Sequence, residues 1–327
     1  RWGPAAARDL LGRTSERLAD VRSGVADLHR AVVALTDAVE GLPVTGLIEL
    51  AARIRESEEL QDRIDRGLLI VGASQSLVED YDAARRTLSM VSRPRTAARG
   101  RREAALLLSA TNDVRQGEWV RARETAEQWL EVAGNAPRSS SRVLLEAWHA
   151  FASGDTDAWS GLAAQCARQA AAEGNSAVTA RLRALEGEIA LFAGDVETAE
   201  RRLRAADLAA ERIPNPQVVR HAADLVHALV RAGRVREAEA AAASLQHHRR
   251  RTSSRWLTLA SARVSALMAP PERAIALHEE AIALFTPEDS RIELAKVQLG
   301  RADAEARTGR DLERRETMAA VAAMLDQ

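Results

Sequence analysis

Residues 180–213, ARLRALEGEIALFAGDVETAERRLRAADLAAERI, contain the pattern that decides the fold. In the second half of this stretch, apolar residues recur at spacings of three and four and form one helical stripe: Val196, Ala199, Leu203, Ala206 and Ala210. Gly194-Asp195 precedes the stripe. Glycine ends a helix without a Cβ clash, and aspartate caps the helix that follows. The stretch therefore predicts two helices joined by a tight turn.

The tight turn recurs along the chain with helix-forming sequence on both sides. Its copies are Gly117-Glu118-Trp119, Gly154-Asp155-Thr156, Gly194-Asp195-Val196, Gly233-Arg234-Val235 and Gly309-Arg310-Asp311, with Glu79-Asp80-Tyr81 in the same place earlier. A second set of positions, mostly alanine, recurs every 36 to 40 residues: Ala84, Ala122, Trp159, Ala199, Ala238, Ala274 and Arg314. Twelve positions before each lies a mostly small residue: Gly72, Ala110, Ala147, Gly187, Val226, Ala262 and Ala302. Helices approach closely only where side chains are small, so the two sets predict repeated helix hairpins.

Small residues at these two places are the pattern of tetratricopeptide repeats, which the sequence resembles. The expected fold is all-α, an α-solenoid of tetratricopeptide-like helix hairpins wound into a right-handed superhelix. We expect about seven repeats over residues 62–327. Residues 1–61 are expected to form N-terminal helices, either diverged repeats or a cap over the first repeat.

Composition excludes several classes of protein. The net charge is −1, which lacks the basic excess typical of nucleic-acid-binding domains. Cys166 is the single cysteine, so no internal disulfide or thiolate metal cluster can form. No apolar run is long enough to span a membrane, and Arg1 begins no secretory signal. We therefore expect a cytoplasmic protein without cofactor or metal, and the first residue, which is not methionine, is compatible with an excised piece or a processed product.

Catalytic motifs are absent as well. The sequence contains no HExxH, GxSxG or paired CxxC, which predicts that the chain is not an enzyme. The basic run His247–Arg251 is expected to be a solvated loop between helices, with a patch for an acidic partner as the alternative. Cys166 lies on an apolar helix face and is expected to be a buried small side chain rather than a nucleophile.

The last third of the chain resembles a known family. Residues 222–240, AADLVHALVRAGRVREAEA, and residues 271–285, PERAIALHEEAIALF, resemble the repeat region of the large LuxR-type ATP-binding transcriptional regulators. In that family a P-loop ATPase domain lies upstream of the repeats and a helix-turn-helix follows them. No GxxxxGK[ST] occurs in this sequence, and Lys296 is the only lysine. The resemblance therefore implies an isolated sensor region that itself binds neither ATP nor DNA.

The first helix of each hairpin is expected to line a concave groove, the surface that such solenoids use for recognition. Projecting the repeat register gives the following groove residues: Trp148, Phe151, Arg181, Glu188, Phe192, Arg220, His227, Arg231, Trp256 and Arg263, with Arg66, Lys296, Asp303 and Arg307 as further candidates. Guanidinium groups bind carboxylate or phosphate in a bidentate manner, and indole offers a flat apolar surface. The expected partner is a small anionic or amphipathic ligand or an acidic peptide or protein, with a homodimer as an alternative assembly.

Two tryptophans occupy places normally held by alanine, Trp129 and Trp159. Either the neighbouring helices repack locally, or these rings form the floor of a pocket between repeats. The leading functional hypothesis is a ligand- or partner-binding sensor domain of a LuxR-type regulator, which controls attached ATPase and DNA-binding domains absent from this chain. The alternative is a general interaction scaffold that binds a peptide or helix in its groove.

Overall fold

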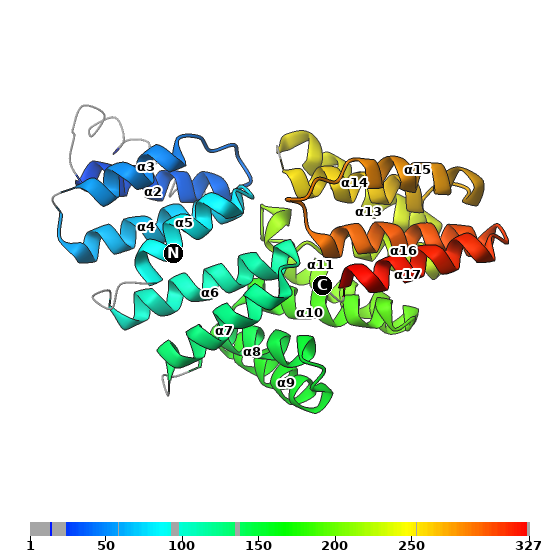
Figure 1. The fold of residues 1–327 in the computed structure, drawn as a ribbon, viewed down its shortest axis with the longest axis horizontal. Helices are drawn as coiled ribbons and strands as arrows, with labels where there is room; N and C mark the ends of the chain where they lie inside the picture. The colour runs from blue at the N-terminus through cyan, green and yellow to red at the C-terminus, as the bar shows by residue number, and fades with distance from the viewer. Residues whose placement is uncertain are drawn as a thin grey trace. The chain divides into compact units, whose positions relative to one another are not determined.

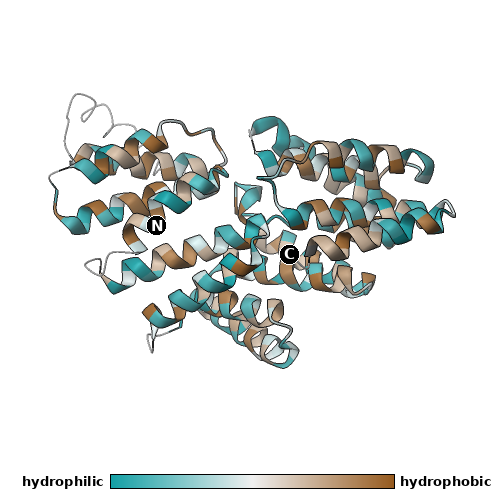
Figure 2. Ribbon diagram, viewed as in Figure 1, coloured by the Kyte–Doolittle hydropathy of each residue, from teal (hydrophilic) through white to brown (hydrophobic). Residues whose placement is uncertain are grey.

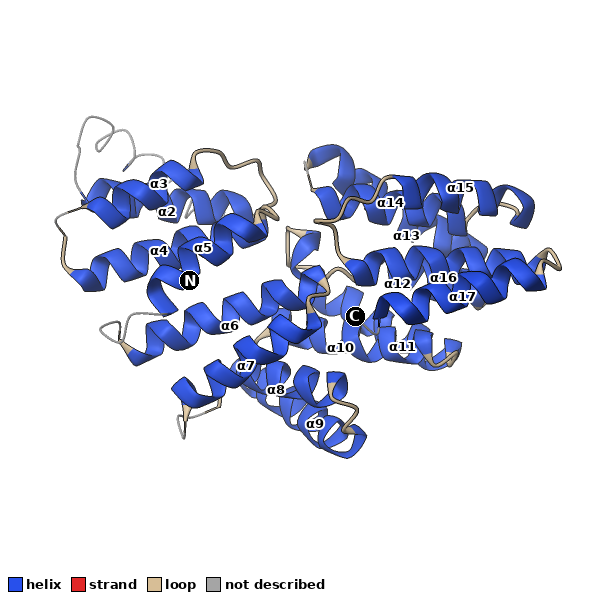
Figure 3. Cartoon of the chain, in the orientation of Figure 1, coloured by secondary structure: helices blue, strands red, loops and turns tan. Residues whose placement is uncertain are grey.

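The structure, a computed structural model, describes residues 14, 24–57, 59–92, 98–134, 138–252 and 254–325. Figure 3 shows that the regular elements in these ranges are helices and that none of them is a strand. Of the helices described, none combines the length and apolar character that crossing a membrane requires. The chain divides into two compact units (Figure 1), the first formed by residues 1–113 and 119–154 and the second by residues 114–118 and 155–327.

Unit 1 contains the helices that precede Gly154. They are α2 (Gly24–Val39), α3 (Leu47–Glu56), α4 (Gln61–Leu77), α5 (Tyr81–Ser92), most of α6 (Arg99–Gln116), α7 (Trp119–Ala133) and α8 (Ser140–Ala152). Helices α2, α3 and α4 pack against one another, and α4 forms a hairpin with α5. Their apolar faces meet in one core that includes Leu50, Leu68 and Leu88.

Unit 2 contains the remaining helices. They are α9 (Thr156–Glu173), α10 (Ser176–Phe192), α11 (Val196–Ala210), the short 3₁₀ helix η1 (Pro216–Val218), α12 (Ala222–Arg231), α13 (Val235–Arg251), α14 (Arg255–Leu267), α15 (Pro271–Ala283), α16 (Arg291–Arg307) and α17 (Asp311–Leu325). Helix pairs α10–α11, α12–α13, α14–α15 and α16–α17 each form a hairpin. The first helices of these hairpins, α10, α12, α14 and α16, also contact one another in that order, and we call them the inner helices. In Figure 2 the helices show apolar stripes beside polar ones, as expected for stacked hairpins with a shared core.

The hairpin turn after α10 has the predicted chemistry. Gly194 adopts φ 80°, a left-handed conformation that glycine reaches at little cost. Asp195 then accepts a hydrogen bond from the backbone nitrogen of Thr198 at 3.0 Å and caps α11. Hydrogen bonds from Thr198 lower the pKa of the Asp195 carboxyl. One turn thus ends a helix and begins the next within three residues.

The small positions of the repeat are where paired helices come closest. A Cβ on Gly187 would lie 2.5 Å from Leu203 Cγ, and a Cβ on Gly72 would lie 2.6 Å from Leu88 Cδ2. The second-helix alanines Ala84, Ala122, Ala199 and Ala238 are fully buried. The packing reason inferred for the small residues is therefore confirmed at these hairpins.

The prediction of a loop at residues 247–251 is wrong. His247 to Arg251 form the end of α13, which begins at Val235. Cations are favourable there because the helix macrodipole leaves partial negative charge at the C-terminal end. Burial is the main cause that lowers the pKa of the His248 side chain, and the nearby His247 and Arg251 lower it further.

Candidate binding site

One row of the repeat register falls on or beside the inner helices of unit 2. Arg181, Arg220, Trp256 and Lys296 each lie six positions before the small residue of their own hairpin, which is Gly187, Val226, Ala262 or Ala302. Arg181, Trp256 and Lys296 lie on α10, α14 and α16, whereas Arg220 lies in the turn before α12. The row carries three cations and one indole.

The first part of the row joins a group of arginines, Arg115, Arg181 and Arg220, which we call the arginine cluster. Arg181 Nε donates a hydrogen bond to the carbonyl oxygen of Val218 at 2.8 Å, and Arg115 Nη2 donates to the same oxygen at 3.3 Å. Arg220 Nη1 lies 3.5 Å from the carbonyl oxygen of Arg115. The turn between α11 and α12 therefore gathers three guanidinium groups, supplied by α6, α10 and the turn itself.

Arg220 is held by the turn and by α14. Its φ is 59°, a left-handed value that is uncommon for any residue except glycine. Arg220 Nη2 donates to Gln217 Oε1 at 2.9 Å, and buried Gln217 donates to Ser254 Oγ at 3.0 Å. The Arg220 guanidinium lies over the Trp256 ring, with its Cζ 5.6 Å from the ring centroid. Cation–π attraction and the amide hydrogen bond together fix the direction of this side chain.

The electrostatic surroundings of Arg181 are unfavourable. Burial lowers the pKa of its guanidinium to about 9, and the positive charges of Arg115 and Arg220 contribute to this shift. Within the described residues Arg181 has no carboxylate partner, and its one hydrogen bond is to Val218. Protein surrounds the side chain on most sides, yet part of its surface stays accessible. An anion could therefore reach this group and offset the repulsion.

Lys296, the last residue of the row, belongs to a buried ion network. We call its members the Lys296 network: Glu188 on α10, Asp224 on α12, Arg263 on α14, and Glu293 and Lys296 on α16. Lys296 Nζ lies 2.9 Å from Asp224 Oδ2, 3.1 Å from Glu188 Oε1 and 3.4 Å from Glu293 Oε1. Arg263 Nη2 donates to Asp224 Oδ1 at 2.7 Å. One ammonium group thus ties α16 to both α10 and α12.

Proton affinities in the Lys296 network follow its geometry. Burial opposes charge on Asp224, yet Lys296 and Arg263 outweigh it and hold the pKa of this carboxyl well below its usual range. Burial likewise opposes charge on Lys296, but Asp224, Glu188 and Glu293 raise the pKa of its ammonium group. Glu188 differs, because burial and the neighbouring carboxylates raise its pKa despite Lys296. Glu188 also keeps 25% of its side chain accessible to solvent, so it lies at the edge of the network.

Burial corrects the expectation of an open groove beside the Lys296 network. Arg263 is 1% exposed, Trp256 is 3% exposed and His227 is 7% exposed. His227 Nε2 lies 3.4 Å from Asp303 Oδ2, so α12 and α16 also meet at this point. The inner helices close on one another here, and Arg263 serves an ion pair instead of a solvent-facing surface.

The other predicted site residues lie elsewhere. Phe192 and Arg231 are exposed at the ends of α10 and α12, and Arg231 Nη1 donates to the carbonyl oxygen of Leu191 at 3.4 Å. Trp148 and Phe151 belong to α8 of unit 1. Trp148 is buried and stacks on Trp119 with ring centroids 5.3 Å apart and planes 4° apart. It is therefore a packing residue in this structure.

Trp129 shows how bulk is accommodated at an alanine place of the repeat. The ring is fully buried, and the guanidinium of Arg142 lies over it at 5.1 Å from the centroid. Arg142 also donates to Glu146 and to the carbonyl oxygen of Gly134. These contacts support local repacking at Trp129, while the pocket floor suggested for Trp159 stays a prediction.

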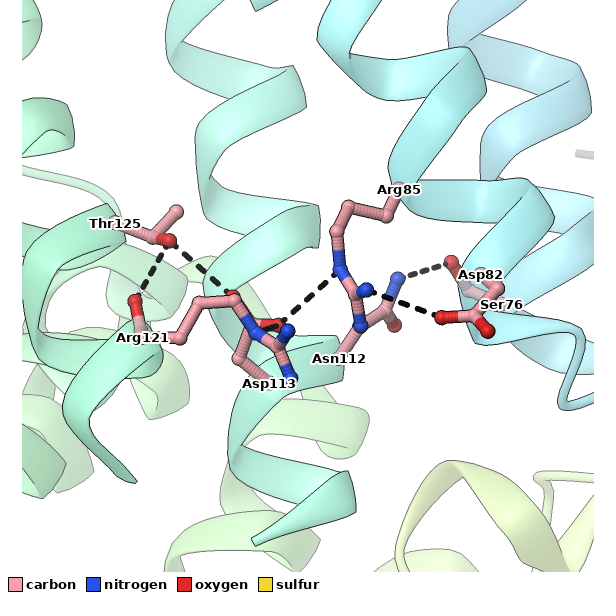
Figure 4. A network of polar contacts seen from close by, with 7 residues as sticks. All are labelled: Ser76, Asp82, Arg85, Asn112, Asp113, Arg121 and Thr125. Carbon is pink, nitrogen blue, oxygen red and sulfur yellow. Dashed lines mark hydrogen bonds and ion pairs between the residues drawn. The ribbon is translucent and has the colours of Figure 1, made fainter. Parts of the chain in front are cut away.

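A polar network in unit 1 joins neighbouring hairpins (Figure 4). Asp113 on α6 accepts hydrogen bonds from Arg121 Nε at 3.0 Å and from Thr125 Oγ1 at 3.2 Å, both on α7. Asn112 Nδ2 donates to Ser76 Oγ on α4 at 2.7 Å. Burial raises the pKa of the Asp113 carboxyl, although the nearby arginines oppose the shift. These contacts link α4, α6 and α7, which favours a structural role.

Cys166 is fully buried on α9, and burial raises the pKa of its thiol to about 11, which disfavours the nucleophilic thiolate. Among the described histidines, cysteines and acidic residues, no group of three or more is placed to hold a metal ion.

Reasoning from the sequence missed Arg115, Asp224 and Glu293. Arg115 follows the small residue Ala110 by five positions, the same offset that led to Phe192 and Arg231. The five-residue offset could therefore have identified Arg115 as a candidate. The role of Asp224 and Glu293 depends on how closely α16 approaches the other inner helices, which the repeat register does not specify.

Comparison with known proteins identifies the fold. No protein-family model matches the chain, and no curated protein matches it either. A crystal structure of Rap protein complexed with competence and sporulation factor matches it with a TM-score of 0.71 over 98% of this chain and 92% of that chain. The sequences are 12% identical, so the likeness concerns the fold. The chain is an all-α solenoid of tetratricopeptide-like helix hairpins.

Proposed function

We propose that this chain is a helical-repeat scaffold that binds a peptide or a segment of a partner protein on the inner helices of unit 2. The observation that carries the proposal is the arginine cluster, which concentrates positive charge on a chain with a net charge of −1. The fold supports it, because stacked hairpins present continuous surfaces for recognition and the Rap protein of the same fold is complexed with a factor.

An amphipathic segment suits the inner face of α10. Arg181 and Phe192 are eleven residues apart, which returns to the same side of the helix and separates them by about 16 Å along its axis. Phe192 is 48% exposed, an unusual state for a phenylalanine. An extended segment covers that distance in about five residues. The expected partner therefore pairs an acidic residue with an apolar one about five positions away.

Selection of binding peptides tests the proposal. A random peptide library is selected against the full chain, and hydrogen exchange is then measured with and without the strongest binder. We expect protection of α10, α12 and residues 214–221. Protection confined to the outer helices α11, α13 and α15 would contradict the proposed surface, and failure to enrich any peptide would contradict the scaffold role itself.

The second candidate function is the sensor region of a LuxR-type regulator. The resemblance of residues 222–240 and 271–285 to that family's repeats favours it, and it is compatible with partner binding by the same surface. The test is the reading frame that encodes this chain. A P-loop domain before residue 1 and a helix-turn-helix after residue 327 are expected, and a frame that encodes neither would leave the general scaffold.

A further inference from the structure

Resting on the proposed scaffold function, we infer that the arginine cluster is a carboxylate site, and that it takes an aspartate or glutamate side chain of the bound segment. Arg181 and Arg115 both donate to one carbonyl oxygen, Val218 O, and Arg220 donates to the carbonyl oxygen of Arg115. Their charges therefore act at short range on the same small region. A guanidinium fork matches the two oxygens of a carboxylate, which gives this site its ligand class.

Arg181 differs from the members of a structural ion network in what surrounds it. The influences that shift Arg181 are burial and two further cations. A folded chain keeps such an arrangement at a cost, because like charges at short range oppose one another. An arriving carboxylate converts that repulsion into attraction and forms charge-assisted hydrogen bonds. The ligand thereby gains from an arrangement that the unliganded protein opposes.

The backbone at Arg220 supports a built site. A left-handed residue with a side chain is strained and persists only where neighbouring contacts impose it. Here Asn215 accepts a hydrogen bond from the nitrogen of Gln217 at 3.0 Å, while Gln217 binds both Arg220 and Ser254. Trp256 is 3% exposed, so its indole is a fixed platform that positions the Arg220 guanidinium beside Arg181.

A peptide carboxylate is favoured over nucleic acid. Phosphate backbones are bound through many separated cations, and their affinity depends on the number neutralised. The arginine cluster is one compact group on a chain with a net charge of −1. It matches one acidic side chain of a segment that continues along α10.

Defined probes test the site on the full chain. The probes are a blocked peptide that alternates alanine and glutamate, the same peptide with glutamine, and inorganic phosphate, and the readout is the midpoint of thermal unfolding. Binding to the native state raises this midpoint. We expect the glutamate peptide to raise it, the glutamine peptide to leave it unchanged, and phosphate to compete. A response to phosphate alone would overturn the inference, because the site would then hold free ions and no peptide side chain.

Substitutions of Arg181 test whether this residue binds the glutamate peptide. Arg181→Met is expected to weaken binding of the glutamate peptide at least tenfold, and Arg181→Lys to weaken it less. Arg183→Met is the matched control, because Arg183 lies on the same helix but pairs with Glu186 at 2.7 Å. Circular dichroism confirms folding of each variant. Equal binding by Arg181→Met and the unaltered chain would overturn the carboxylate site. If a selected partner also bound both equally, the scaffold role would remain and only the carboxylate site would be lost.

Discussion

Arg181 and Arg220 of the arginine cluster share one row of the repeat with Lys296, yet the charges around them are opposite. Lys296 lies among Asp224, Glu188 and Glu293, whereas Arg181 lies beside two cations. Neighbouring side chains, and not register, therefore decide whether a cation in this row closes the structure or is available to a ligand. A network of paired charges fixes how helices meet, and a cluster of like charges is where an incoming anion has most to gain.

The chemistry of the two cations also differs. The chain has 46 lysines and arginines, and Lys296 is the only lysine among them. An ammonium group is a compact charge with three donors, which suits three carboxylates approaching from different directions. Guanidinium is planar and binds two oxygens side by side. The two regions thus use the cation that fits each geometry.

The largest expected effect comes from removing the cation of the Lys296 network. In Lys296→Met, Asp224 and Glu293 lose their shared partner and remain buried. We expect the free energy of unfolding to fall by about 3–5 kcal/mol, the usual result of breaking a buried ion pair from one side. Urea denaturation measures it.

Two companion variants sharpen that result. Lys296→Arg keeps the charge but brings a larger, planar group into a packed site, so a loss of about 1–3 kcal/mol is expected. Arg273→Met removes an exposed cation from α15 and is expected to change stability by less than about 0.5 kcal/mol. If Lys296→Met were as stable as Arg273→Met, the network would not be what holds α16 to α10 and α12.

Removing a cation from the arginine cluster should act differently. In Arg181→Met, relief of repulsion from Arg115 and Arg220 offsets the lost hydrogen bond to Val218. Stability is therefore expected to stay within about 1 kcal/mol of the unaltered chain. Added sodium chloride should stabilise the unaltered chain more than the variant, because salt screens the accessible cluster. Thermal unfolding over a salt series measures both, and a loss above about 2 kcal/mol would show that Arg181 is structural.

The smallest effect is expected at the edge of the Lys296 network. The raised pKa of Glu188 means that the folded chain holds this proton where the unfolded chain has released it. This carboxyl therefore lowers stability as pH rises from about 4.3, the ordinary value for glutamate, through its folded pKa. In Glu188→Gln that decline is absent, and the variant should be within about 1 kcal/mol of the unaltered chain at neutral pH. Urea denaturation at several pH values checks this, and parallel pH profiles would contradict it.

The fold was open to prediction from the sequence because close helix packing needs small side chains. Gly187 and Ala199 recur in register, and their burial reflects direct contact between paired helices. The row containing Arg181 and Arg220 followed from the same register. The register did not predict which of these residues are exposed to solvent, because the closure of α16 onto α10 and α12 depends on side chains far apart in sequence. Arg263 was consequently expected on a surface and is found in an ion pair.

The solitary lysine gives the molecule a built-in chemical reporter. Its ε-amine is the only one in the chain, and 7% of that side chain is accessible. Amine-directed acylating reagents and lysine-specific proteases can act at this position only when α16 separates from its neighbours. The rate of modification at Lys296 therefore measures how often unit 2 opens, without any label having to be introduced.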